Sequence, residues 1–113
     1  MRPDDLYLVD LIEAAAAIAQ YLDGVAKDRW DGDEMLRSAV LHKLMVIGEA
    51  AARLSPATRA SMPDIPWPAV VGFRNLVVHE YFALDTDIVW HTARVQVPIV
   101  HQVAASCLAG ARG

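Results

Sequence analysis

This 113-residue chain has only one cysteine, no long apolar run and no excess of basic charge, and each lack excludes a class of protein. Its single cysteine, Cys107, cannot form an internal disulfide and has no zinc-ligand pattern around it, so we expect a small buried hydrophobic residue. No apolar run approaches the ~18 uncharged residues of a membrane span, and residues 1–5 are too acidic for a signal peptide. We therefore expect a soluble, cytoplasmic protein.

Basic residues are fewer than acidic ones, ten against fourteen, which gives a formal net charge of −4. A broad electrostatic nucleic-acid binder usually carries a basic patch or stripe, so this balance argues against one. The balance still allows an enzyme that grips one or two phosphates with a single arginine.

The composition favours helices in one domain covering residues 1–113. Hydrophobic residues make up 55% of the chain, too many for disorder, and alanine is abundant. Apolar residues recur at the three- and four-residue spacing of amphipathic helices, and short connections between long helices predict an antiparallel bundle. The predicted fold class is therefore all-α, a bundle of four main helices plus a short one.

Capping residues and prolines set the predicted boundaries. We expect a polar turn at Lys27–Gly32, an N-cap at Asp31 or Asp33, a second N-cap at Ser55 before Pro56, and a kink at Pro98. The predicted helices run over residues 4–26, from that first cap to 54, from 56 to about 62, from 67 to about 78, and from 85 or 86 to about 108.

The segment from Arg74 to Tyr81 places a guanidinium, an imidazole and a phenol within eight residues. Arginine is always charged and its planar fork of donors suits phosphate, whereas histidine exchanges a proton near neutral pH. Together, Arg74 and His79 could cleave a phosphodiester bond without a metal. The other histidines, His42, His91 and His101, have no metal-binding spacing, so no metal or cofactor is expected.

The spacing alone leaves the arrangement of these groups open. At ~100° per residue, Arg74 and His79 lie ~140° apart on a regular helix, so they share a site only if the helix loosens or if two copies of the chain form a cleft. A structural alternative pairs Arg74 with Glu49 and hydrogen-bonds His79 to a carbonyl. Glu49 is thus either an internal partner that positions Arg74 or an ordinary solvated residue.

A family resemblance bears on that choice. The run from Ile65 to Phe82, with arginine, four residues, histidine, any residue and tyrosine, resembles the signature of the HepT toxins, a branch of the HEPN ribonucleases. The segments Ile47–Ala51 and Asp87–Trp90 and the late Pro98 are also similar to that family. The resemblance covers nearly the whole chain.

The resemblance implies a helical homodimer, with the motif helices facing each other across a cleft, that cleaves RNA such as tRNA or mRNA without a metal. Carried over residue by residue, Arg74 and His79 are catalytic, and Asn75 is a supporting polar group. It also implies a partner, the minimal nucleotidyltransferase MntA, which neutralises the toxin by transferring AMP to Tyr81. The alternative function is a non-catalytic helical dimer that binds and regulates such a nucleotidyltransferase.

Overall fold

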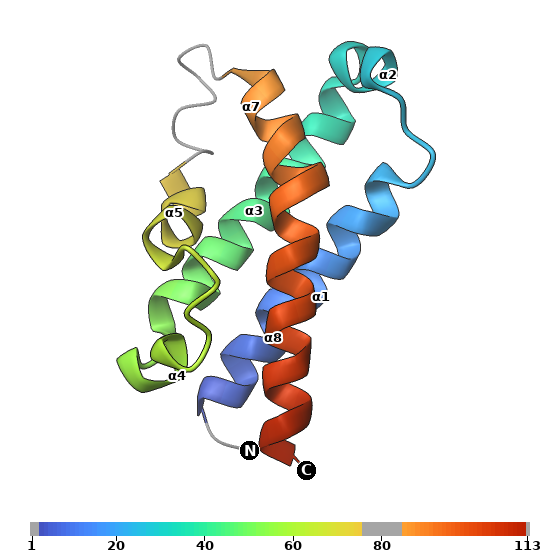
Figure 1. The fold of residues 1–113 in the computed structure, drawn as a ribbon. Coiled ribbons are helices and arrows are strands. Elements are labelled where there is room, and N and C mark those ends of the chain that lie inside the picture. The colour runs from blue at the N-terminus through green and yellow to red at the C-terminus, as the bar shows by residue number, and fades with distance from the viewer. Residues whose placement is uncertain (1–2, 76–84, 113) are drawn as a thin grey trace.

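Long helices lying antiparallel to one another make up the molecule. A computed structural model describes residues 3–75 and 85–112, and within these ranges every regular element is helical (Figure 1). The predicted all-α class is confirmed. The elements are α1 Pro3–Leu22, α2 Lys27–Gly32, α3 Glu34–Arg53, α4 Pro56–Ala60, α5 Trp67–Val71, the 3₁₀-helix η1 Gly72–Asn75, α7 Thr86–His91, the π-helical segment η3 Thr92–Gln96 and α8 Val97–Arg112.

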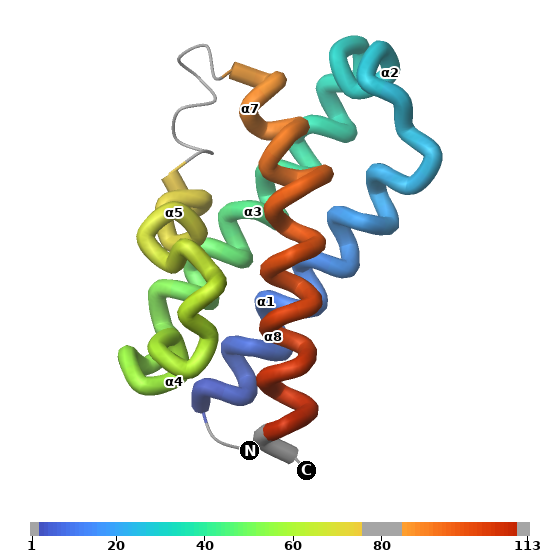
Figure 2. The backbone as a smooth tube through the Cα atoms, viewed as in Figure 1, coloured from blue at the N-terminus to red at the C-terminus, as the bar shows by residue number. Residues whose placement is uncertain are grey.

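Helix α1 lies at the centre of the packing. It contacts both α3 and α8, and α3 in turn contacts α5 and η1. The trace in Figure 2 shows α1 running in one direction while α3 and α8 return in the other. The shared core is formed by fully buried aliphatic side chains, among them Leu11, Ile18, Leu44, Ile47 and Val97. The site-bearing segment α5–η1 is therefore held against α3.

The predicted N-caps are confirmed. The Asp33 side chain accepts a hydrogen bond from the Leu36 backbone N–H at 2.9 Å, and Asp33 is the cap chosen over Asp31. Ser55 accepts from the Thr58 N–H at 3.2 Å with Pro56 in the first turn, and Asp85 caps α7. Each cap satisfies backbone donors that a helix start leaves unpaired.

The predicted turn at residues 27–32 is wrong, because this polar stretch forms helix α2. Its Trp30 is fully buried, and Arg37 donates from Nη1 to the carbonyls of Trp30 at 2.8 Å and Asp31 at 2.7 Å. Burial of the indole and satisfaction of the terminal carbonyls stabilise a helical turn that the polar composition hides. Helix α1 accordingly ends earlier than predicted, at Leu22, before Gly24 with its left-handed φ of 70°.

The predicted interruption at Pro98 is confirmed and takes the form of the π-helical segment η3 just before it. Proline cannot donate to the preceding turn and its ring clashes with the carbonyl four residues back. A wider turn relieves both problems, and such π-bulges are single-turn features inside α-helices. Helices α7 and α8 therefore continue one another through η3 instead of separating (Figure 1).

The expected regular helix over residues 67–78 is only partly observed. Helix α5 ends at Val71 and the chain tightens into η1 over the next four residues, while the rest of the expected helix lies outside the described residues. Helix α4 also ends two residues early, at Ala60. Across residues 3–75 and 85–112, none of the helices combines the length and apolar character needed to span a membrane.

Candidate functional site

Arg74 and Asn75 end the segment α5–η1 and are exposed, although the segment itself is anchored in the core. Three side chains at successive three-residue spacing, Trp67, Val70 and Phe73, are buried at 8%, 2% and 6% exposure. The Trp67 indole also donates to the Arg59 carbonyl at 2.9 Å and to the Met62 carbonyl at 3.2 Å. This anchoring turns the opposite face, with the guanidinium and the amide, toward solvent.

Gly48 fixes the backbone of Arg74 against α3. A Cβ added at Gly48 would lie 2.5 Å from the Arg74 backbone nitrogen, 3.1 Å from the Val71 carbonyl oxygen and 3.2 Å from the Arg74 Cβ. No side chain fits this gap, so glycine in the middle of α3 is the condition for this close approach. A glycine in the middle of a helix lowers the stability of that helix by about 1 kcal/mol relative to alanine. The close packing of η1 against α3, which only glycine allows here, compensates for this loss.

Glu49 does not hold Arg74 through a direct contact. It is exposed on α3 and lines a small hollow with Tyr7 and Asp10 of α1, whereas its neighbour Gly48 faces Arg74. Within residues 3–75 and 85–112, the Arg74 guanidinium makes no hydrogen bond or ion pair. The structural alternative of an Arg74–Glu49 pair is therefore not formed, and an indirect supporting role for Glu49 stays a prediction.

The remaining predicted site residues, His79 and Tyr81, lie outside the described residues. Convergence of Arg74 and His79 thus stays a prediction. The structure describes the residues on either side of this segment. Asn75 ends η1 before it, and Asp85 caps the start of α7 after it.

The start of α7 is held by contacts to α2. The Trp30 indole donates to the Thr86 carbonyl at 3.1 Å, and its ring lies 5.4 Å from that of Trp90. Lys27 pairs with Asp87 at 2.6 Å and with Asp31 at 2.7 Å. Hydrogen bonds to these two carboxylates, first Asp31 and then Asp87, raise the pKa of Lys27 above its ordinary value. The described segments before and after the motif, η1 and the start of α7, are therefore both fixed to the bundle.

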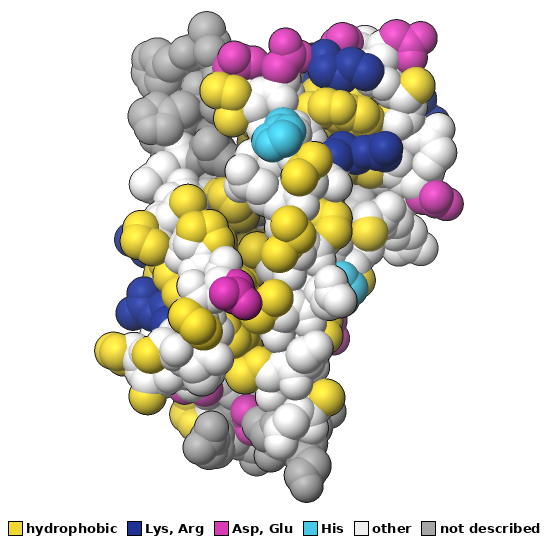
Figure 3. Space-filling model, viewed as in Figure 1, with side chains coloured by type: hydrophobic (Ala, Val, Ile, Leu, Met, Phe, Trp, Pro, Cys, Tyr) yellow, Lys and Arg dark blue, Asp and Glu magenta, His cyan; other side chains and the backbone are white. Residues whose placement is uncertain are grey.

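Charge is distributed unevenly along the chain, so the net value of −4 conceals a basic part. Residues 3–34, which form α1 and α2 and reach the start of α3, hold nine acidic and two basic residues, a net charge of −7. Residues 35–75, which include most of α3, α4, α5 and η1, hold five basic and two acidic residues, a net charge of +3. In Figure 3, dark blue side chains lie at the edge of the molecule beside α4 and α5. The segment that presents Arg74 thus lies in the basic part.

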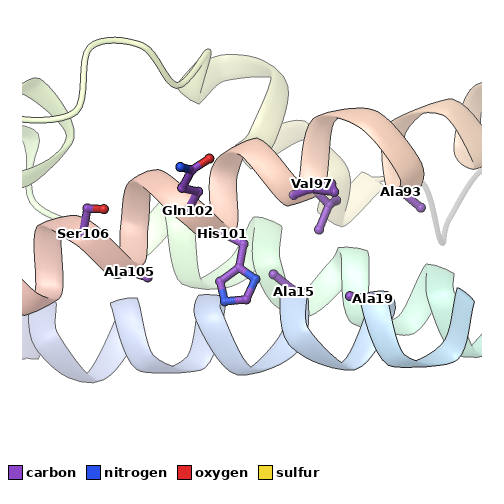
Figure 4. A pocket seen from close by; sticks show the side chains of 9 residues that line it. Ala15, Ala19, Ala93, Val97, His101, Gln102, Ala105 and Ser106 are labelled. Atoms are coloured by element: carbon purple, nitrogen blue, oxygen red, sulfur yellow. The ribbon is translucent and has the colours of Figure 1, made fainter. Parts of the chain in front are cut away.

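A groove of about 350 Å³ between α1 and α8 is a poor match to the predicted chemistry. Its walls are mostly small side chains, including Ala15, Ala19 and Ala93, and the His101 ring points toward α1 (Figure 4). His101 is the single ionisable side chain among the described residues that line it. Across the described ranges, no group of three or more His, Cys, Asp or Glu residues is placed to hold a metal ion.

An all-α bundle whose sequence carries an arginine, a histidine and a tyrosine at this spacing matches a known class of enzyme. The model of the family described as Ribonuclease HepT-like matches residues 11–106. The chain belongs to this HepT-like ribonuclease family, and the resemblance and the enzyme class predicted from the motif are confirmed at that level.

Individual relatives agree with the family match. The protein "Putative RNase MJ1380" of Methanocaldococcus jannaschii is 30% identical over 92 residues, which cover 81% of this chain and 84% of that protein. "Probable ribonuclease HepT" of Thermococcus cleftensis is 28% identical over 92 residues, which again cover 81% of this chain and 84% of that protein. No solved structure matches the chain.

Proposed function

We propose that this protein is the ribonuclease toxin of a toxin–antitoxin pair, acting in the cytoplasm as a homodimer that cleaves tRNA or mRNA without a metal. The observation that carries the proposal is the state of Arg74: it is exposed, without an ion partner among the described residues, and fixed through its backbone at Gly48. A permanent cation held in place without a counter-charge suits a substrate phosphate.

The proposed chemistry assigns one role to each side chain. Arg74 holds the scissile phosphate and stabilises the negative charge that grows on it. His79 takes the proton of the ribose 2′-hydroxyl, which attacks the phosphorus, or gives a proton to the leaving 5′-oxygen. Two subunits supply two histidines, one for each transfer, and the product is a 2′,3′-cyclic phosphate. Asn75, exposed beside Arg74, supports the site by hydrogen bonding.

Tyr81 is the proposed site of regulation. A minimal nucleotidyltransferase partner transfers AMP from ATP to the Tyr81 phenol: the phenolic oxygen, losing its proton, bonds to the α-phosphorus and pyrophosphate leaves. The modification adds a phosphate where the substrate backbone binds. Like-charge repulsion and steric blockage then switch the site off. Mass spectrometry of the protein coexpressed with that partner tests this step, because AMP addition is expected on wild type and not on Tyr81→Phe.

The charge distribution favours this proposal over a non-catalytic regulator of a nucleotidyltransferase. An acidic protein is a poor match to an RNA substrate and would favour the regulator, but most of the acidity belongs to residues 3–34, whereas residues 35–75 have a net charge of +3. A decisive experiment expresses wild type and His79→Ala separately in bacteria. Wild type is expected to stop growth and yield RNA ends with 2′,3′-cyclic phosphate, and His79→Ala to do neither. Growth unaffected by soluble wild type contradicts the enzyme and favours the regulator.

A further inference from the structure

We propose that the hollow between α4 and α5 is a second RNA-binding subsite, in which Arg59 binds the backbone phosphate of a nucleotide next to the scissile one. The inference rests on the proposed ribonuclease function and names further substrate contacts for it. The hollow is lined by Pro56, Arg59, Trp67, Pro68 and Val71, and its volume is about 430 Å³. That volume falls within the ~300–1,000 Å³ of pockets for small ligands.

The walls of the hollow are apolar and fixed. Pro56 begins α4 and Pro68 lies in the first turn of α5, so both backbones are restricted in φ. Trp67 joins the two helices, because its indole donates to the Arg59 and Met62 carbonyls while its ring is buried. Proline and valine side chains offer an apolar shelf for the flat face of an unpaired base, and unpaired bases are the usual targets in RNA recognition.

The charge of the hollow matches a phosphate. Arg59 is half-buried, and its guanidinium makes no hydrogen bond or ion pair with residues 3–75 or 85–112. None of the described residues that line the hollow is a carboxylate, although Asp64 lies in the loop between α4 and α5. The apolar shelf suits the base of a nucleotide, and the Arg59 guanidinium suits its negatively charged phosphate.

The hollow lies on the helical segment that leads to Arg74, since Pro68 and Val71 line it and belong to α5. Pro68, Val71 and Arg74 follow one another at three-residue spacing along α5 and η1, which keeps them near one side of the helix. At ~1.5–2.0 Å rise per residue, Val71 lies ~5 Å along the axis from Arg74. Consecutive phosphates along one strand are separated by a distance of the same order. One extended strand that binds Arg74 can therefore continue along α5 to Val71 and into the hollow that Arg59 also lines.

Matched arginine variants test the subsite. Arg59→Gln keeps most of the aliphatic stem but removes the charge, Arg59→Lys keeps the charge, and Arg53→Gln is the control. Arg53 is exposed on α3 and lines a different hollow, with Tyr7 and Asp10. The structural hydrogen bonds of Arg59 use its backbone carbonyl, so the side-chain variants leave them in place. The probes are a mixed-sequence single-stranded RNA carrying 2′-O-methyl groups, for binding, and the unmodified RNA, for cleavage.

Arg59→Gln is expected to weaken binding about tenfold and raise KM with kcat unchanged, because a contact equal in ground and transition states affects only binding. The slope of log affinity against log salt should fall by about 0.7, the value for one single-strand phosphate. Arg59→Lys should recover most of the affinity and Arg53→Gln should match wild type.

If wild type cleaves RNA and Arg59→Gln behaves like Arg53→Gln, the proposed subsite is wrong while the ribonuclease function stands. If Arg59→Gln weakens only binding of a protein partner, the subsite is also wrong. If wild type neither binds nor cleaves RNA, both proposals fall.

Discussion

The cations at the α2–α7 junction and those between residues 43 and 74 differ in what they contact. At the junction, Lys27 pairs with two aspartates, and Arg37 donates to two backbone carbonyls. Arg94 lies over the Trp90 ring at 5.0 Å and donates to the Leu22 carbonyl at 3.3 Å. These side chains have their charge and donors committed to the fold.

The second group contains Lys43, Arg53, Arg59 and Arg74. None of these four side chains makes a hydrogen bond or ion pair with another described residue. Cations that already have partners serve the fold, whereas unpaired ones remain available to an anionic ligand. The contrast therefore separates cations committed to the fold from cations whose charge is free among the described residues, and of the free ones only Arg74 and Arg59 are proposed to contact the substrate.

The largest expected effect is that of His79→Ala. Loss of a positioned proton-transfer group should lower the cleavage rate by about 10²–10⁴-fold. The rate of RNA cleavage measures this effect, and circular dichroism melting tests whether the fold is intact. His91→Ala, which alters an exposed histidine on α7, is the control and should retain full activity. A folded His79→Ala protein with the wild-type rate would remove histidine from the mechanism.

Arg74→Ala should follow, with a loss of about 10²–10³-fold in kcat/KM, typical for removal of one transition-state donor. Arg37→Ala is the matched variant from the structural group and should lower the melting temperature while the folded protein keeps its kcat. Steady-state kinetics and thermal melts on both proteins measure the contrast. The distinction between the two groups collapses if Arg37→Ala removes activity from a fully folded protein and Arg74→Ala does not.

Gly48→Ala should give a smaller but combined effect. Its methyl group would meet the Arg74 backbone nitrogen at 2.5 Å, so η1 must shift, and overpacking of this kind costs about 1–3 kcal/mol. We expect lower stability and a displaced arginine with reduced kcat/KM. Gly110→Ala on α8 is the control, because nothing lies within 4 Å of the added group there. Equal stability and activity in the two variants would show that α3 does not position Arg74.

Trp30→Phe should destabilise the junction by about 1–2 kcal/mol, since it removes the indole bond to the Thr86 carbonyl and some packing on Trp90. Chemical denaturation measures the loss. Activity per folded molecule is expected to stay within a few-fold of wild type, because the tryptophan holds the start of α7 and not the substrate. A loss of activity as large as that of Arg74→Ala would place the junction within the catalytic machinery.

The smallest effect is expected at alkaline pH. Because its carboxylate partners raise the pKa of Lys27, their stabilisation is complete at neutral pH and is lost as the pH rises through the folded-state value above 10.5. Lys27→Gln should therefore lower the melting temperature slightly at pH 8 and converge with wild type once the pH exceeds that folded-state value. Lys43→Gln, at a lysine without an ion partner among the described residues, should show no such convergence. A constant difference between Lys27→Gln and wild type at every pH would contradict the role of the ion pairs.

Local sequence signals were sufficient for the helix starts and for the break at Pro98, because caps and prolines act within a few residues. They failed at α2, where the stabilising event is long-range: burial of Trp30 and the hydrogen bonds from Arg37. The change to a 3₁₀ turn at Gly72–Asn75 was missed for the same reason, since it depends on packing against α3.

The candidate site shows the same division. The motif identified Arg74 and the family, but the role of Gly48 depends on a backbone 26 residues away in sequence. A glycine within an otherwise regular helical pattern is the signal that could have indicated this close approach. The hollow around Arg59 leaves no sequence signal, because α4 and α5 meet only in the folded chain.

The most direct test of the central claim is a crystal structure of the protein with an RNA whose scissile nucleotide carries a 2′-deoxyribose, which blocks cleavage. We expect one backbone phosphate within hydrogen-bonding distance of both the Arg74 guanidinium and a His79 imidazole, from the same or the partner copy. A bound strand whose phosphates avoid Arg74, or the two side chains in separate enclosed environments, would contradict it.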